Sequence, residues 1–341
     1  MSIPVFKPMI RRKEMDAVLS CLVDETIAYG NVSRRFVRSL AQYIGCSGGF
    51  AFKETYRGIS TILKCLEIEI GGRIILSPLA PSVYVQAIID LGLKPLYADV
   101  SEDDALISNA SIQKLLQFDP KAIILSTTLG YIPDIEEIME LNLPLIEDIS
   151  EGFGGNTGSK KAGSYGDFTI LSLEPDKIIS SAGGCVILGK GKKELNQMKK
   201  NISIYEDDML LPNMNSSLGY AQFEGIENSI EKRKEIAQLF ISAVQKSRHT
   251  TLFQKGEGEN IFYSFPVLLS TGMKDAEKYA SRKGVGTVSA FENACINLYQ
   301  IEETPCPVAQ SLLLRCLLFP LYPTLGAKNT ELIIKILSTL P

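Results

Sequence analysis

Histidine and tryptophan are almost absent from this sequence. Its 341 residues contain one histidine, His249, and no tryptophan. His249 stands among Arg248, Thr250 and Thr251 and has no partner at a spacing typical of metal ligands. The sequence therefore gives little support to a zinc site or to a Ser-His-Asp triad, and we expect no metal.

Paired cysteines, a basic excess and long apolar runs are also missing. None of the seven cysteines forms a Cys-x-x-Cys pair, so we expect reduced thiols in a cytoplasmic protein. The net charge is −4, which argues against a nucleic-acid partner. The apolar run from Leu312 to Leu321 is broken by Arg315 and is shorter than the roughly 20 residues that span a bilayer. We therefore expect no membrane segment.

Short apolar segments and helical patterns alternate through the first half of the chain. Runs rich in Ile, Leu and Val predict strands at residues 73–77, 95–100, 121–126 and 143–147. Helical patterns occur at residues 13–24, 33–44, 55–66, 82–91, 112–116 and 134–140. This alternation predicts an α/β fold in which helices cover both faces of a mostly parallel sheet.

The pattern changes after Asp148. A glycine-rich stretch precedes two further strand-like runs, at residues 168–173 and 184–188. A long helical region then covers residues 215–246, with a bend expected near Gly225. The rest of the chain is typical of a smaller α+β unit. We predict a large domain of residues 1–225 and a small C-terminal domain of residues 226–341.

Two charged residues follow predicted strands. Asp148 stands at the carboxyl end of a strand, where open α/β sheets bind their ligands. It is either a catalytic acid or a helix cap. Lys177 follows the next strand-like run and a proline. On its own, a lysine in such a place is typical of a solvated loop.

The residues around Asp148 and Lys177 carry a family resemblance. An acid-Asp-x-x-Glu-x-x-Gly run at residues 147–154 is followed by Gly-Ser-x-Gly-Asp at 163–167, by Ser172 and Lys177 in an apolar-Ser-apolar-x-Pro-x-Lys segment, and by Gly183-Gly184. This block resembles the DegT/DnrJ/EryC1/StrS family of sugar aminotransferases, which have the type I fold and depend on pyridoxal 5′-phosphate (PLP). Weaker similarities at residues 27–30, 218–223 and 316–323 extend the resemblance nearly end to end.

The resemblance implies a role for each matching residue. Lys177 would bind PLP covalently and move a proton, which requires a neutral amine, so we expect the site to disfavour the ammonium. Asp148 would hold the proton of the pyridine nitrogen. The other cofactor contacts expected are Glu151 near the ring, and Thr55, Tyr56, Arg57 and Ser172 around the phosphate. Glu151 and Thr55 could instead serve a helix N-terminus, and Ser172 could be a plain strand residue.

The sequence departs from the family at four places. Glu54 replaces the glycine before Thr55, and Pro81 replaces the aromatic residue that stacks on the ring, for which Tyr84 could substitute. Asp208 and Leu210 stand where the family has the asparagine and arginine of the neighbouring subunit. The histidine of a late loop is absent from residues 290–293.

Two functions from different classes remain open at this stage. The first is an aminotransferase, expected as a homodimer, that moves an amino group from an amino acid such as glutamate to a keto sugar linked to a nucleotide. The second is a catalytically degenerate homologue that acts as a binding or regulatory protein. A nucleotide-binding protein of another fold has little support, because the Gly-x-Gly-x-x-Gly and Walker motifs are absent.

Overall fold

A seven-stranded sheet forms the centre of the computed structural model, which describes residues 2–202, 207–253, 258–301 and 303–341. Six of its strands run in one direction and only β9 runs against them. This confirms the prediction of a mostly parallel sheet. In spatial order the strands are β1 (Gly48–Phe52), β9 (Cys185–Gly189), β8 (Phe168–Ser172), β5 (Leu145–Asp148), β4 (Pro120–Ser126), β2 (Arg73–Leu76) and β3 (Lys94–Tyr97).

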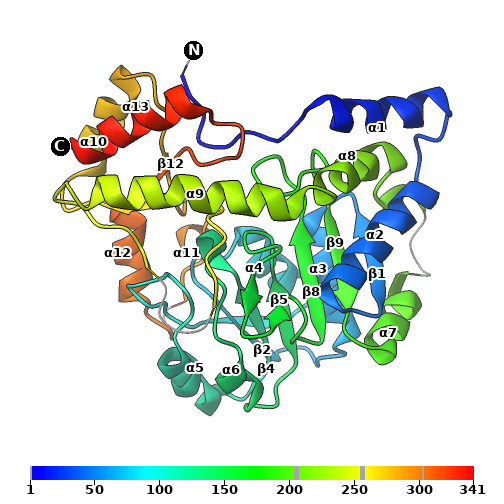
Figure 1. Ribbon diagram of the computed structural model, residues 1–341. Coiled ribbons are helices and arrows are strands. Elements are labelled where there is room, and N and C mark those ends of the chain that lie inside the picture. Colours follow the sequence, from blue (N-terminus) through cyan, green and yellow to red (C-terminus); the bar gives the residue numbers. More distant parts are fainter. Residues whose placement is uncertain (1, 203–206, 254–257, 302) are drawn as a thin grey trace.

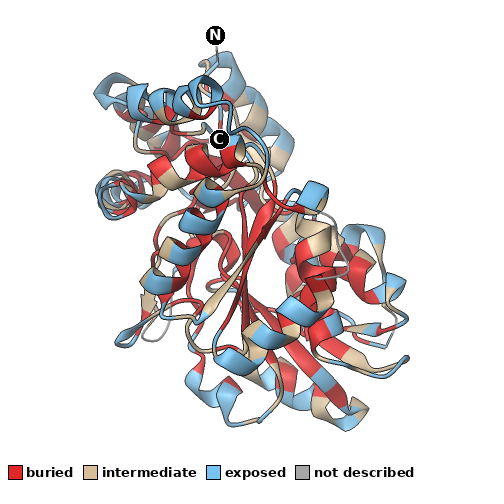
Figure 2. Ribbon diagram, turned by 90° about the vertical axis from the view of Figure 1, so that its right-hand side faces the viewer, coloured by how far each residue is buried: buried red, intermediate tan, exposed pale blue. Residues whose placement is uncertain are grey.

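Helices cover both faces of this sheet. Every residue of β5, β8 and β9 is buried, which explains why these strands do not alternate between apolar and exposed polar residues. Figure 2 shows the buried strands between helices whose outer surfaces are exposed. In the part of the chain up to residue 202, the helices are α1 (Arg12–Val23), α2 (Asn31–Ile44), α3 (Thr55–Cys65), α4 (Ser82–Asp90), α5 (Asn109–Leu115), α6 (Glu136–Met139) and α7 (Lys192–Ile202).

The predicted helical region at residues 215–246 consists of two helices. They are α8 (Asn213–Phe223) and α9 (Ile226–Val244), and Gly225 separates them as the N-cap of α9. The bend predicted near Gly225 is therefore confirmed. Figure 1 shows α9 running from the large sheet to the C-terminal part of the chain.

The C-terminal part of the chain contains a second sheet. It is antiparallel, with the spatial order β10 (Phe265–Leu268), β12 (Cys316–Phe319) and β11 (Val288–Ser289). Phe240, Phe319 and Ile333 belong to a buried cluster around it, whereas Phe291 and Cys295 pack into the core of the large sheet. The domain boundary at residues 225–226 stays a prediction. The helices of this part are α10 (Met273–Arg282), α11 (Cys295–Leu298), α12 (Pro307–Arg315) and α13 (Ala327–Ser338).

Strand β1, helix α7 and a hairpin of β6 (Asn156–Thr157) and β7 (Lys160–Lys161) were not predicted. Strand β1 begins with Gly48-Gly49, and glycine weakens the sequence pattern of a strand. A Cβ atom at Gly49 would lie only 1.9 Å from the carbonyl oxygen of Ile187 on β9. Close pairing with β9 therefore explains both the strand and its glycine.

The helices of the described ranges give no candidate for a membrane span, since none is both long and apolar enough.

Candidate active site

A cavity of about 590 Å³ opens where the parallel strands of the large sheet end. Ser126, Asp148 and Ser172 are the last residues of β4, β5 and β8, and all three line it. The opposite wall includes Tyr263 and residues 288–294 from the C-terminal part of the chain. Of the predicted site residues, the structure brings Thr55, Tyr56, Tyr84, Asp148, Glu151, Ser172 and Lys177 together in this lining.

A short loop after β8 positions Lys177. The backbone N–H of Leu173 donates to the carbonyl of Gly184 at 2.8 Å. The carbonyl of Leu173 accepts from the backbone N–H groups of Ser181 and Gly183. Gly184 has a φ of +90°, and a Cβ there would lie 2.4 Å from the carbonyl oxygen of Phe52. The glycine pair after Lys177 is therefore required by a left-handed backbone and close packing.

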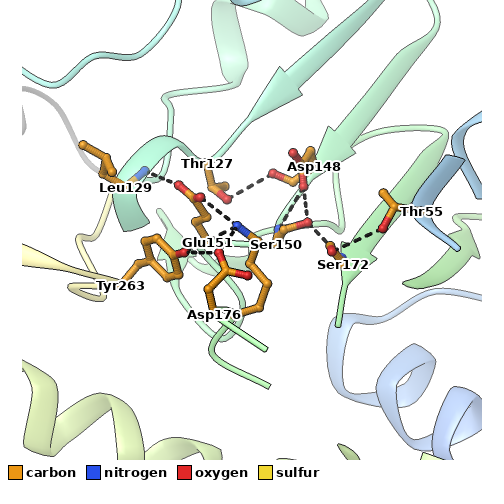
Figure 3. Close-up of polar contacts among 10 residues, drawn as sticks. Thr55, Thr127, Leu129, Asp148, Ser150, Glu151, Ser172, Asp176 and Tyr263 are labelled. Atoms are coloured by element: carbon orange, nitrogen blue, oxygen red, sulfur yellow. Dashed lines mark hydrogen bonds and ion pairs between the residues drawn. The ribbon is translucent and has the colours of Figure 1, made fainter. Parts of the chain in front are cut away.

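Acidic groups surround the amine of Lys177. Its Nζ lies 3.0 Å from Glu151 Oε1 and 3.0 Å from Asp176 Oδ2. It also lies 3.4 Å from the hydroxyl of Tyr263, which donates to Asp176. Figure 3 shows Glu151, Asp176 and Tyr263 converging on one point. Glu151 is held on its other side by the backbone N–H of Leu129, at 2.7 Å.

These acids decide the charge of Lys177. Burial by itself disfavours the ammonium, but the carboxylates of Glu151 and Asp176 outweigh it and raise the pKa of Lys177 well above its usual range. Burial also raises the pKa of Tyr263, which therefore stays a neutral phenol. The pKa of Asp176 is lowered, because Lys177 and the Tyr263 hydroxyl outweigh its own burial. The expectation that the site would disfavour the ammonium is therefore wrong, and the reason is the two neighbouring carboxylates.

The carboxylate of Asp148 begins a chain of hydrogen bonds that runs from the end of β5 past the end of β8 to the start of α3 (Figure 3). Its Oδ1 accepts from the backbone N–H of Ser150 at 3.0 Å and from the Ser150 hydroxyl. The same Ser150 oxygen accepts from the backbone N–H of Ser172 at 2.9 Å. The Ser172 hydroxyl in turn lies 3.3 Å from that of Thr55, at the first residue of α3. The orientation of Asp148 is thus fixed from the side of Ser172.

The predicted phosphate contacts do not all converge. Thr55 and Ser172 present their hydroxyls together at the N-terminus of α3. Tyr56 lines the cavity, but its hydroxyl donates to Asp90 at 2.8 Å. Arg57 is not among the lining residues, and its guanidinium lies 5.9 Å from the centre of the Tyr56 ring. Thr55 and Ser172 are therefore the better placed of the four.

Tyr84 lies deeper than the prediction assumed. Only 1% of its surface is exposed, and its pKa is raised by burial and then by the negative charge of Asp148. Pro81, at the place of the family's stacking residue, lines the cavity as well. The role of Tyr84 as a substitute for that stacking residue stays a prediction.

Glu147 explains the Gly-Ser-x-Gly-Asp part of the sequence block. Its buried carboxylate accepts from the backbone N–H groups of Gly163, Tyr165 and Gly166 at 2.6–2.7 Å. A Cβ at Gly166 would lie 2.8 Å from the carbonyl oxygen of Leu145. The acid before Asp148 therefore anchors the glycine loop to β5, which positions β5 against β8.

Three of the four family departures lie in the lining of this cavity, the exception being Asp208 and Leu210. Glu54 and residues 290–293 line it, so the late loop reaches the site without a histidine. Leu210 is buried and forms an isolated β-bridge with Phe52 of β1. Asp208 lies in the short helical turn just before Leu210. Within the described ranges no cluster of three or more His, Cys, Asp or Glu side chains could hold a metal ion.

The donor groups of the cavity fit PLP. The cofactor needs an amine for covalent attachment, a carboxylate for its ring nitrogen and hydrogen-bond donors for its phosphate. Lys177, Asp148 and the Thr55–Ser172 pair supply these from one cavity. Glu54, as the N-cap residue of α3, makes no side-chain capping bond and adds negative charge beside this pair.

Four contributors to the site were missed by sequence reasoning. Thr127 donates to the carbonyl of Asp148, Ser150 binds its carboxylate, and Asp176 binds Lys177. Ser150 and Asp176 are neighbours of the predicted residues, so a closer reading of the same block could have found them. Tyr263 has no such signal, because it stands 87 residues after its partner Asp176.

Comparisons with known proteins identify the family of the chain. The family model described as the DegT/DnrJ/EryC1/StrS aminotransferase family matches residues 8–338. A GDP-perosamine synthase of Escherichia coli is 24% identical over 95% of this chain and 94% of its own length. A UDP-4-amino-4,6-dideoxy-N-acetyl-beta-L-altrosamine transaminase of Campylobacter jejuni is 24% identical over 76% of this chain and 74% of its own length.

Solved structures show the same fold. The aminotransferase PseC of Helicobacter pylori, involved in the biosynthesis of pseudoaminic acid, matches with a TM-score of 0.90 and 18% identity over 99% of this chain and 98% of its own. These findings confirm the resemblance, the type I fold and the dependence on PLP that the resemblance implies. The chain belongs to the DegT/DnrJ/EryC1/StrS aminotransferase family.

Proposed function

We propose that this protein transfers an amino group from an amino acid, with glutamate as the expected donor, to a keto sugar that is linked to a nucleotide. The observation that carries the proposal is the meeting of Lys177 and Asp148 in one cavity at the carboxyl ends of β5 and β8. The relatives from E. coli and C. jejuni, whose names describe the formation of amino sugars on nucleotides, support the choice of acceptor.

Each residue has a distinct task in this proposal. Bound PLP supplies an electron sink for the carbon that loses its proton. Lys177 Nζ removes that proton from the amino donor and returns one to the acceptor. Asp148 holds a proton on the ring nitrogen, and Glu151 Oε1 keeps the lysine amine within the cavity. Thr55 and Ser172 bind the phosphate through their hydroxyls.

The function is tested by adding PLP to the purified protein and recording its visible spectrum. We expect a yellow complex that a suitable amino donor bleaches and a keto sugar restores. A panel of amino acids identifies the donor, and keto sugars with and without a nucleotide identify the acceptor. A protein that stays colourless at saturating PLP would contradict the proposal and favour the binding or regulatory alternative.

The protein is further proposed to act as a homodimer, and α1 carries the observation that supports this. Helix α1 packs against α8, yet Met15, Leu19, Leu22 and Val23 are each at least 50% exposed. Their positions, i, i+4, i+7 and i+8 from Met15, place them on one side of the helix. A stripe of this kind is typical of a surface that another protein covers.

Leu19→Glu is expected to shift the dimer toward monomers by at least tenfold in dissociation constant, because it places a charge in the apolar contact. Sedimentation or light scattering at several concentrations measures the shift. Leu239→Glu on α9 is the matched control, since Leu239 is 51% exposed and Leu19 55%. A wild-type protein that is monomeric at micromolar concentration would contradict the dimer.

A further inference from the structure

One oxygen atom of Asp176 is shared between two groups that come from distant parts of the chain. Asp176 Oδ2 binds Lys177 Nζ at 3.0 Å and accepts a hydrogen bond from the Tyr263 hydroxyl at 2.7 Å. The centre of the Tyr263 ring lies 5.0 Å from the same amine. Figure 3 shows the Tyr263 side chain reaching toward Asp176 from the side opposite Ser172. The contact therefore joins the loop after β8 to the segment before β10.

The position of Tyr263 is fixed by its own neighbours. Its side chain is only 3% exposed, and its ring packs 5.3 Å from that of Phe6. Its backbone carbonyl accepts from the buried guanidinium of Arg233 at 2.8 Å. The same guanidinium nitrogen also binds the carbonyl of Leu321 at 2.9 Å. Helix α9 and the N-terminal segment thus hold the phenol against Asp176.

We propose that Tyr263 is a positioning residue for Lys177 that acts through Asp176. The phenol donates a hydrogen bond to the carboxylate and so takes up part of the negative charge that would otherwise bind the ammonium. Asp176 keeps the lysine charged, and Tyr263 limits how strongly it does so. The inference rests on the proposed function, because that function requires Lys177 to release a proton.

The distances decide which contact of the Tyr263 hydroxyl matters more. A hydrogen bond of 2.7 Å to a carboxylate lies in the short, charge-assisted range. The 3.4 Å to Lys177 Nζ is at the outer limit for a hydrogen bond. Removing the hydroxyl should therefore strengthen the hold of Asp176 on the amine, whereas removing the charge of Asp176 should weaken it. The two changes are expected to have opposite effects.

The reactivity of Lys177 toward acetic anhydride measures this, because only the neutral amine reacts. The full chain, freed of any bound PLP, is labelled at pH 7.5, and the peptide that contains Lys177 is quantified by mass spectrometry. Asp176→Asn is expected to raise the labelling rate roughly tenfold, which corresponds to one pKa unit. Tyr263→Phe is expected to lower it about two- to threefold, and the double variant should equal Asp176→Asn alone.

Two references control this experiment. The exposed Lys335 on α13 serves as the internal standard in every sample. Glu174→Gln removes another acid of the cavity wall whose carboxylate is not bonded to Lys177, so its labelling rate should stay within twofold of the wild type.

Three results would overturn the inference: equal shifts in Glu174→Gln and Asp176→Asn, shifts of the same sign in Tyr263→Phe and Asp176→Asn, or a full Tyr263→Phe effect in the double variant. If Asp176→Asn fails to fold, Tyr263→Phe decides alone, since it removes a single oxygen, and a raised or unchanged rate contradicts the inference. The labelling needs no cofactor. A wild type that fails to bind PLP but shows the expected labelling pattern would therefore count against the proposed function only.

Discussion

Lys177→Ala is expected to lose turnover by about four orders of magnitude and to lose the visible absorbance of the bound cofactor. The side chain is proposed both to attach PLP and to move the proton, and proton transfer by a positioned group alone contributes up to about 10⁴-fold. No other described lysine lies within the cavity wall apart from Lys53, which is exposed before α3. The visible spectrum and single-turnover kinetics measure the two losses separately.

The charge left behind by this substitution needs its own control. Without the ammonium, Glu151 and Asp176 face each other across the space that the amine occupied. Lys177→Gln keeps a hydrogen-bond donor between them but has no amine, so it should fold like the wild type and remain colourless. Lys335→Ala on the exposed side of α13 should keep both colour and turnover. A Lys177→Gln protein with wild-type absorbance would contradict the assignment.

The sequence was sufficient for the parts of the site that lie close together along the chain. Asp148 ends β5, Glu151 follows it and Lys177 follows β8, and parallel strands bring their carboxyl ends to one edge of the sheet. Glu147 and the glycine pair were part of the recognised block, but the sequence assigned them no role. Their physical reasons, three backbone hydrogen bonds and a carbonyl oxygen too close for a Cβ, required coordinates.

The parts that could not be predicted depend on contacts between distant segments. Strand β1 owes its conformation to pairing with β9, not to the preference of Gly48-Gly49. Tyr263 reaches Asp176 because Arg233 on α9 holds its backbone. The sequence also predicts the wrong direction for the pKa shift of Lys177, because the site was expected to disfavour the ammonium. Burial was foreseeable from the strand pattern, but the two carboxylates that outweigh it are oriented by the fold.

Asp148→Asn separates the two roles that the sequence left open for Asp148. As a cap, Asp148 Oδ1 accepts from the Ser150 backbone at 3.0 Å, and the amide oxygen of asparagine can accept in the same place. A cap alone therefore predicts almost no loss of stability or turnover. As the partner of the ring nitrogen, the carboxylate must keep a proton on that nitrogen. The NH₂ group of asparagine would instead point a hydrogen-bond donor at the protonated nitrogen, which is itself a donor.

We expect Asp148→Asn to lower turnover by about 10²–10³-fold, the range measured when one preorganised electrostatic contact is removed. Attachment of PLP to Lys177 does not depend on this carboxylate, so the visible absorbance should persist. Ser150→Ala is the matched control, because it removes one donor to Asp148 but leaves its charge, and its loss of turnover should be smaller. Turnover equal to the wild type in Asp148→Asn would assign Asp148 to the backbone of Ser150 alone and leave the ring nitrogen without its proposed partner.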